Sequence, residues 1–319
     1  MGLPTKTVLP TTTRAARLYG ARDLRVEEVD VPPVVPDEVM VAVAAVGVCG
    51  SDMHYYAAGR NGLNILGQPT VLGHEASGVV IAAGASSGVV TGTRVAVKPA
   101  IGCGVCPTCR SGQYNICPVG TCFGSPPTNG TMSEYIVVPA RAVHALPASI
   151  DTLTGAMIEP LSVAVWAVQR AQVRAGHRVL ITGAGPIGIL TAQVARASGA
   201  TEIVMTDVND DRLAMATTFG ATRVINTSRE DLDVTGMDRV LHSTAVPAVL
   251  WSAIKTVRPG DRVTVDPRRP HQDRRRVRNH HCRRPLRPRH AAARWTAAAT
   301  HPPGRHPPRS GPAAHEPDH

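Results

Sequence analysis

Short apolar runs separated by turn residues fill the first half of the chain. Examples are EVMVAVAAVGV, ASGVVIAAG, TRVAVKPA and EYIVVPA, with Gly, Pro, Ser and Asn between them. Short strands at this spacing are typical of a mostly β domain such as a small barrel. We therefore predict a β domain that ends near residue 150.

A helical segment follows the predicted β domain. It reads DTLTGAMIEPLSVAVWAVQRA, and Pro160 lies within it. Because proline is tolerated in the first turn of a helix and kinks its interior, Pro160 should begin or bend this helix. We expect the helix to connect the β domain to the second half of the chain.

Strands and helices alternate in the second half. The predicted strands are RVLITGAG, EIVMTD, RVIN, DRVLHS and DRVTVD, and the predicted helices are PIGILTAQVARASGA, NDDRLAMATTFGA and VPAVLWSAIKTVRPG. This alternation predicts a parallel, doubly wound sheet, so the fold class is α/β. The pattern stops at the end of the fifth strand, at Asp266.

A glycine-rich turn joins the first of these strands to the first helix. The motif GAGPIG places Gly183, Gly185 and Gly188 in G-x-G-x-x-G, with Pro186 and Ile187 between the last two. Such a turn lets a pyrophosphate approach the backbone N–H groups at the helix N-terminus. The alternative is a turn that serves packing alone.

An acidic residue supports dinucleotide binding rather than packing alone. Asp207 ends the next predicted strand, where a carboxylate binds the ribose hydroxyls of NAD and repels the extra phosphate of NADP. We therefore predict NAD binding. Arg212, on the following helix, either lies along the adenosine or is a solvated charge.

Four cysteines lie close together on one loop. GCGVCPTCRSGQYNIC contains Cys103, Cys106, Cys109 and Cys117. Four thiolates satisfy tetrahedral zinc with no open position, which predicts a structural site. A disulfide pair and an iron–sulfur cluster are the alternatives. Cys122 lies just outside the array, and we expect it to be an ordinary buried thiol.

A third set of polar residues is dispersed along the chain. One thiolate, one imidazole and one carboxylate from separate loops form a three-ligand zinc site with one open position. The candidates are Cys49, Ser51, Asp52, His54, His74, Glu75 and Glu159.

The order of these motifs resembles one enzyme family. CGSDMHYYAAGRNG, VLGHEASG, the four-cysteine loop, IEPLSV and GAGPIG occur in the order seen in zinc-dependent medium-chain dehydrogenases, most closely the polyol branch of sorbitol, xylitol and L-iditol 2-dehydrogenases. The resemblance covers about residues 15–265. It implies a GroES-like zinc-binding catalytic domain at 1–152 and a Rossmann NAD-binding domain with its linker helix at 153–266, incomplete because the sixth strand is missing.

The resemblance also implies roles for the dispersed residues. Cys49, His74 and Glu159 would hold a catalytic zinc, and Glu75 would be a direct or alternate ligand. Together with the four-cysteine site, this gives one catalytic and one structural zinc. The implied reaction is oxidation of a polyol secondary alcohol to a ketose, with hydride transfer to NAD.

Four neighbouring residues complete the implied active site. Asp52 would orient a ligand imidazole. Ser51 and His54 would pass the alcohol proton to solvent, and Tyr55 would contact the substrate.

The alternative to an active enzyme is a disrupted, inactive member of the family that retains its zinc sites.

The C-terminal segment 267–319 differs from the rest of the chain. It contains 13 Arg, 10 Pro and only 3 acidic residues, and it accounts for the whole formal net charge of +10. This low-complexity composition predicts a disordered basic tail, and we interpret it as an out-of-frame product. Nucleic-acid binding is disfavoured, because Trp295 is its only aromatic residue and no stacking motif repeats.

Localisation and partners follow from the remaining features. The chain has no apolar run of membrane length and no signal peptide, and its clustered cysteines suit a reducing compartment, so we expect a cytoplasmic protein without membrane partners. The resemblance implies a small polyol substrate. Family members are homo-oligomers, although the strand that assembles them is not recognisable here.

Overall fold

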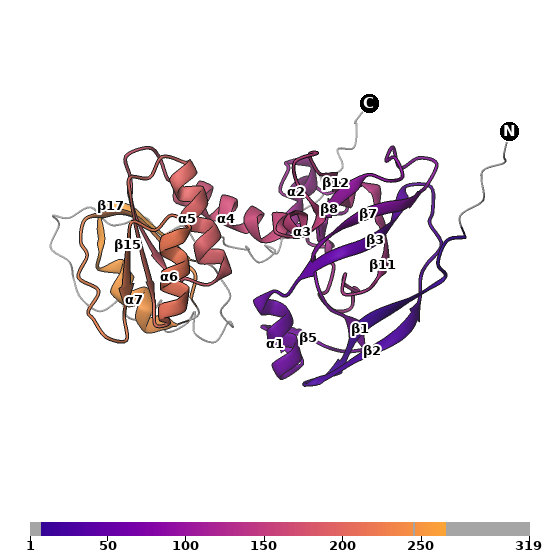
Figure 1. The fold of residues 1–319 in the computed structure, drawn as a ribbon, viewed down its shortest axis with the longest axis horizontal. Coiled ribbons are helices and arrows are strands. Elements are labelled where there is room, and N and C mark those ends of the chain that lie inside the picture. The colour runs from indigo at the N-terminus through magenta and orange to yellow at the C-terminus, as the bar shows by residue number, and fades with distance from the viewer. Residues whose placement is uncertain (1–7, 245, 266–319) are drawn as a thin grey trace, which may run out of the picture.

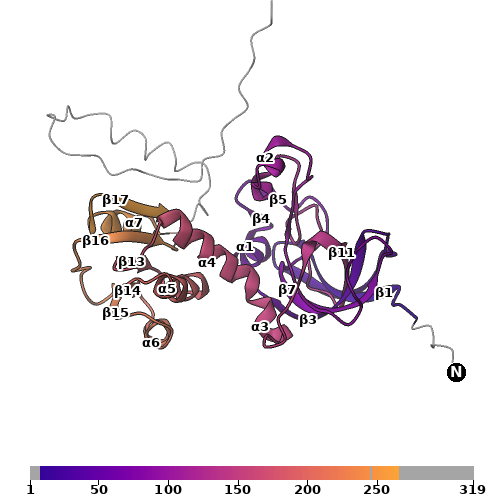
Figure 2. The ribbon, with the colours of Figure 1, turned by 90° about the horizontal axis from the view of Figure 1, so that it is seen from above.

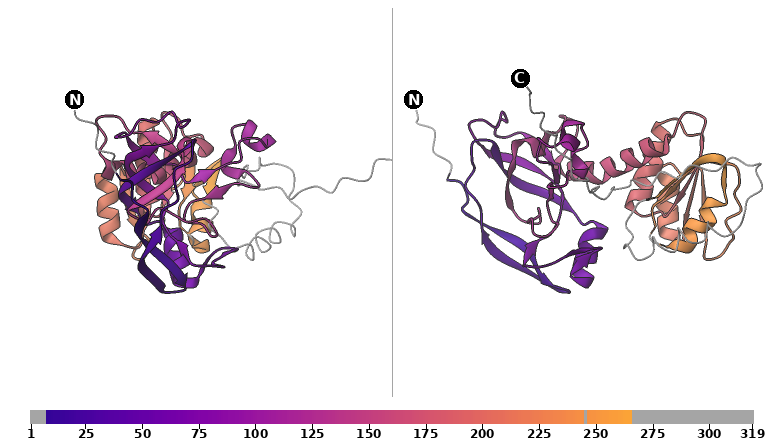
Figure 3. Two further views of the ribbon diagram at one scale, coloured as in Figure 1. Left: turned by 90° about the vertical axis from the view of Figure 1, so that its right-hand side faces the viewer. Right: turned by 180° about the vertical axis from the view of Figure 1, so that it is seen from behind.

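The computed structural model describes residues 8–244 and 246–265. Figure 1 shows a β lobe formed by the N-terminal half and an α/β lobe formed by the C-terminal half. Helix α4 (Ile158–Ala171) runs between the two lobes, and Figure 3 shows it from two further directions. The predicted tail at 267–319 lies outside the described residues.

An antiparallel sheet of five strands forms the centre of the β lobe. Its core contains mainly valines, which suit a pleated surface that is buried on one side. The strand order is β11 (Tyr135–Pro139), β3 (Glu38–Gly47), β7 (Glu75–Ala83), β8 (Arg94–Val97) and β12 (Val143–Ala145). The prediction of a mostly β first half is confirmed.

Smaller elements surround this sheet. A three-stranded sheet has the order β2-β1-β6, and two further pairs are β4 with β5 and β9 with β10. The bounds of these strands are β1 Thr12–Gly20, β2 Asp23–Asp30, β4 Arg60–Asn61, β5 Asn64–Ile65, β6 Thr70–Val71, β9 Ala100–Ile101 and β10 Thr121–Cys122. The helices are α1 (Gly50–Ala58), α2 (Pro107–Arg110) and the 3-10 turns Tyr114–Ile116 and Ala140–Ala142.

A parallel sheet of five strands forms the α/β lobe, as predicted. Its order is β15 (Arg223–Asn226), β14 (Glu202–Asp207), β13 (Arg178–Thr182), β16 (Met237–His242) and β17 (Val257–Val265). Residues of α4, α5 (Pro186–Ala197) and α6 (Asp210–Thr218) pack on one face, and residues of α7 (Pro247–Ile254) pack on the other. Figure 2 shows this arrangement from above.

Two predicted helices differ in detail from the observed ones. The linker segment forms two helices, α3 (Thr152–Ala156) and α4, and Pro160 lies in the first turn of α4, where its missing N–H is tolerated. The prediction that VPAVLWSAIKTVRPG is one helix was wrong at its C-terminal end. Its last residues belong to β17, because Pro259 cannot continue a helix and Gly260 adopts φ +90°.

Within the described residues, no helix is both long enough and apolar enough to cross a bilayer.

Candidate functional site

The four-cysteine loop brings its sulfur atoms into one compact group. The Sγ atoms of Cys103, Cys106, Cys109 and Cys117 all lie within 4.8 Å of one another. The Cys103–Cys109 pair is 4.0 Å apart and the Cys106–Cys117 pair is 3.8 Å apart. A tetrahedral zinc with bonds of about 2.3 Å separates its sulfur ligands by about 3.8 Å, so the spacing fits this ion. All four cysteines are free, which excludes the predicted disulfide alternative in this structure.

Backbone N–H groups prepare these sulfurs for a cation. The N–H of Cys106 donates to Cys103 Sγ at 3.4 Å, and the N–H of Cys109 donates to Cys106 Sγ at 3.4 Å. Donation from Cys106 and from Val105 lowers the pKa of Cys103 to about 6. The backbone N–H of Gly104 lowers the pKa of Cys109, but burial and hydrogen bonds with the other three thiols raise it to about 12. Since the thiolate is the metal-binding form, Cys103 favours a metal, and Cys109 would lose its proton on binding one.

A second group lies between α1 and β7. Cys49 precedes the first turn of α1, while His74 and Glu75 come where the chain enters β7. The ligand atoms of these three residues lie within 4.8 Å of one another, and Glu75 is only 9% exposed. One thiolate, one imidazole and one carboxylate match a zinc site that leaves a position open.

Glu159 lies near this group but outside it. It occupies the first turn of α4, and its negative charge helps to raise the pKa values of His74 and Cys122. Its carboxylate does not belong to the group of ligand atoms, those of Cys49, His74 and Glu75, that lie within 4.8 Å of one another. The structure thus brings Glu75 rather than Glu159 to Cys49 and His74, and ligation by Glu159 stays a prediction.

Asp52 ties the two ligand-bearing segments together. One carboxylate oxygen accepts a hydrogen bond from the N–H of Cys49 at 2.9 Å, and the other accepts from the N–H of Gly73 at 3.1 Å. The second oxygen also lies 3.8 Å from His74 Nδ1. Asp52 is 2% exposed, so these contacts occur where an unpaired carboxylate would be costly. The orienting role of Asp52 toward His74 stays a prediction.

The local interactions shift the pKa values of His74 and Cys49 in opposite directions. Burial alone would lower the pKa of His74, but a hydrogen bond with Cys49 and the charges of Asp52, Cys49 and Glu159 raise it to about 9. Burial alone would raise the pKa of Cys49, but hydrogen bonds with His74 and Ser51 lower it. A cation at this group would displace the proton of His74.

The predicted proton path begins at this group. Ser51 hydrogen-bonds Cys49, and His54 is exposed one turn further along α1. Tyr55 differs from expectation in its surroundings, because it is 2% exposed and packs with Leu18 and Leu72. Its predicted contact with substrate stays a prediction.

Two residues that sequence reasoning missed hold the Tyr55 hydroxyl. Asn64 Nδ2 donates to it at 2.9 Å and to Ser125 Oγ at 2.8 Å, and the two hydroxyls lie 3.2 Å apart. These contacts join α1, β5 and the loop after β10. No sequence motif marked Asn64 or Ser125, since they are distant in the chain.

Cys122 belongs to neither group of metal-binding atoms. Burial, followed by the negative charges of Glu159, Asp52 and Cys49, raises its pKa to about 11. A thiol with this pKa remains protonated at neutral pH.

The glycine-rich turn has the geometry that dinucleotide binding needs. Gly183 adopts φ +96°, and a Cβ at Gly188 would overlap the carbonyl oxygen of Gly183, so both positions require glycine. Gly185 lies directly before α5, and a Cβ built on it would meet no atom within 4 Å. Pro186 and Ile187 follow it in the first turn of the helix. The open space lies at a helix N-terminus, where a pyrophosphate binds.

Asp207 holds this turn from the next strand. Its Oδ2 accepts from the N–H of Ala184 at 2.8 Å, and its Oδ1 accepts from the N–H of Val208 at 2.8 Å. Arg212 is exposed on α6, so its two predicted alternatives both remain open.

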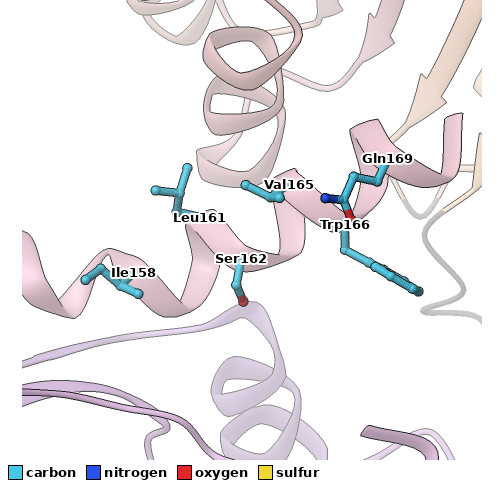
Figure 4. A pocket seen from close by; sticks show the side chains of 6 residues that line it. All are labelled: Ile158, Leu161, Ser162, Val165, Trp166 and Gln169. Carbon is cyan, nitrogen blue, oxygen red and sulfur yellow. The ribbon is translucent and has the colours of Figure 1, made fainter. Parts of the chain in front are cut away.

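A shallow apolar groove runs along α4. It has a volume of about 320 Å³, and Figure 4 shows the side chains that line it. They are Ile158, Leu161, Ser162, Val165, Trp166 and Gln169.

Comparison with known proteins agrees with both lobes. Residues 35–148 match the alcohol dehydrogenase GroES-like domain family, and residues 186–266 match the zinc-binding dehydrogenase family. Sorbitol dehydrogenase from Bacillus subtilis is 37% identical over 266 residues, which cover 81% of this chain and 75% of that protein.

Two solved structures show which cofactors similar proteins bind. A zinc-binding dehydrogenase from Sinorhizobium meliloti 1021 bound to NADP has a TM-score of 0.74 and 30% identity, covering 80% of this chain and 77% of that one. An alcohol dehydrogenase from Escherichia coli CFT073 complexed with NADH has a TM-score of 0.74 and 30% identity, covering 83% and 80%. The first of these neighbours is thus described with zinc and NADP, and the second with NADH. The chain belongs to the zinc-dependent medium-chain dehydrogenases, in their polyol dehydrogenase branch.

Proposed function

We propose that this chain oxidises a secondary hydroxyl of a polyol to a ketone and transfers the hydride to NAD. The meeting of Cys49, His74 and Glu75 within 4.8 Å, from two separate elements, carries the proposal. The similarity to a sorbitol dehydrogenase supports a polyol as substrate. We also propose a catalytic domain at 1–152 and an NAD-binding domain at 153–266.

Cys49, His74 and Glu75 would hold the catalytic zinc, with Glu159 as an alternate ligand on α4. When bound, zinc supplies a Lewis acid that makes the substrate hydroxyl easier to deprotonate. Asp52 keeps the Cys49 and His74 segments in place. Ser51, beside Cys49, would relay the released proton: its oxygen accepts that proton while its own hydroxyl proton passes on to the imidazole of His54, which is exposed and would release it to solvent.

The charge of Asp207 supports NAD over NADP. Its carboxylate lies at the end of β14 and accepts a hydrogen bond from the N–H of Ala184 in the glycine-rich turn. An acid at this position of a dinucleotide-binding sheet would bind the adenosine ribose. A 2′-phosphate at this position would face a like charge. The pyrophosphate would contact the glycine-rich turn, formed by Gly183, Gly185, Pro186, Ile187 and Gly188.

The second candidate is a chain that binds zinc without useful turnover. One observation favours it: β17 is the last strand of the parallel sheet within the described residues, and it pairs on one side only, with β16. An edge strand of this kind lacks the support of a further neighbour. Incubation of the purified chain with sorbitol or xylitol and NAD separates the candidates. NADH formation supports the enzyme, and bound zinc without NADH supports the second candidate.

A further inference from the structure

We infer that Gly47 is a positioning residue for the metal centre, because its missing side chain makes the room in which the Glu75 carboxylate lies. The inference rests on the proposed function, in which Glu75 is a zinc ligand. Gly47 ends β3 and faces Glu75, the first residue of β7, directly across the antiparallel pair.

The space beside Gly47 is filled by one side chain. A Cβ built on Gly47 would overlap Glu75 Oε2 and would lie 3.0 Å from Glu75 Cβ and 3.2 Å from Glu75 Cδ. All three nearest atoms belong to Glu75. Directly opposed residues in a sheet normally keep their Cβ atoms about 4.5 to 5.5 Å apart, so any larger residue at position 47 must displace the carboxylate.

Backbone conformation does not explain this glycine. Gly47 is absent from the glycines with positive φ, so an alanine could adopt the same backbone dihedrals. Gly73, by contrast, has φ +89° and requires glycine for its conformation. The remaining reason for glycine at position 47 is room for Glu75.

The displaced carboxylate would leave the metal-binding group. Glu75 is 9% exposed and lies among the donor atoms with Cys49 and His74, so it has little alternative space on its own side of the sheet. Gly47 and Cys49 are two residues apart, and side chains at this spacing in an extended chain point to the same side. A methyl group at position 47 therefore points toward the centre.

The test is a double-mutant cycle of Gly47 and Glu75. Gly47→Ala should weaken zinc binding at this centre by about 10- to 100-fold, as does loss of groups that orient metal ligands, measured by chelator competition and by the visible spectrum after cobalt substitution. Glu75→Gly should weaken it to a similar extent. The double variant Gly47→Ala/Glu75→Gly should show no further loss, because the alanine then occupies vacated space.

Stability provides an independent readout. Gly47→Ala should lower the denaturant midpoint of the metal-free protein, whereas the same change in the Glu75→Gly background should not. Gly78→Ala is the matched control on β7, since its Cβ would overlap the carbonyl oxygen of Ala42 instead, and its effect should be the same in both backgrounds.

The outcomes are distinct. Unchanged zinc affinity in Gly47→Ala, or effects of Gly47→Ala and Glu75→Gly that simply add, would overturn the inference. If Gly47→Ala fails to fold, a folded double variant supports the inference and an unfolded one overturns it. Failure of the unaltered chain to bind zinc at Cys49 would instead contradict the proposed function, and the coupling in stability would still decide the role of Gly47.

Discussion

Asp52 accepts a hydrogen bond from the backbone N–H of Gly73, 21 residues away, at 3.1 Å. The same carboxylate accepts from the N–H of Cys49 at 2.9 Å. One buried side chain therefore fixes the distance between the segment that carries Cys49 and the segment that carries His74. The metal centre depends on this bridge as much as on the ligands.

Replacing Asp52 with Asn should loosen the bridge. An amide nitrogen cannot accept, so one buried N–H loses its partner, at a cost of about 1–3 kcal/mol in the free energy of unfolding. Zinc affinity should fall by about 10- to 100-fold. Asp23→Asn, which breaks an exposed ion pair with Arg25, is the control and should change neither quantity measurably in denaturant and chelator titrations. Equal effects of the two variants would contradict the bridging role.

The four-cysteine loop and Cys122 should respond differently to the same substitution. Cys106→Ser removes one of four thiolates, and we expect the protein to retain only the zinc at Cys49 after dialysis against a chelator. Cys122→Ser should retain both ions, because Cys122 lies in neither group. Metal analysis after dialysis measures the number of zinc ions that each variant retains. Loss of zinc from Cys122→Ser would show that the ligand assignment is wrong.

Substitution of two glycines of the dinucleotide turn should affect different properties, stability for Gly188 and NAD binding for Gly185. Gly188→Ala places a Cβ against the carbonyl of Gly183, so it should destabilise the protein by about 1–3 kcal/mol. Gly185→Ala meets nothing within 4 Å and should leave stability unchanged. It should nevertheless weaken NAD binding about 10-fold or more, since the methyl enters the space for the pyrophosphate. Thermal unfolding and fluorescence titration with NAD distinguish these effects.

Asp207 should determine the choice between NAD and NADP. Asp207→Asn removes the negative charge and keeps the shape of the side chain. We expect the ratio of NAD to NADP affinity to fall by about 10- to 100-fold, the range that corresponds to one charge-assisted hydrogen bond. Asp210→Asn, an exposed acid paired with Arg229, is the control. An unchanged ratio in Asp207→Asn would mean that other groups select the cofactor.

Zinc binding at Cys49 should release a proton at neutral pH. His74 has a pKa raised to about 9, so the metal-free imidazole is protonated at pH 7 and must lose its proton to bind metal. Zinc affinity at this centre should therefore rise with pH, by up to about tenfold per unit, and level off above about pH 9. Calorimetry in buffers of different ionisation enthalpy measures the proton. Comparison with Cys49→Ala removes the contribution of the four-cysteine loop, and a pH-independent affinity would contradict the expectation.

Local patterns were sufficient to predict much of the fold and part of the site. The five parallel strands, the turn at Gly183 and the four-cysteine loop all involve residues that are close in sequence, so their spacing carries the information. The end of α7 was predicted too late, because only Lys255 and Thr256 separate its last apolar residues from β17, and Pro259 lies inside that strand.

The remaining features depend on contacts between distant segments. Which glutamate meets Cys49 and His74 is decided by how β7 and α4 approach, and no spacing in the sequence separates Glu75 from Glu159. The burial of Tyr55 follows from its packing with Leu18 and Leu72, and its hydroxyl is held by Asn64 and Ser125. The role of Gly47 follows from the register of β3 and β7. None of these relationships has a local signal.

Oxidation of a polyol by the purified chain is the most direct test of the proposed function. The chain loaded with zinc should reduce NAD in the presence of sorbitol or xylitol, seen as NADH absorbance, and Cys49→Ala should abolish this signal while it retains the zinc of the four-cysteine loop. A chain that holds zinc at both centres and binds NAD, yet forms no NADH with either polyol, would contradict the proposed function.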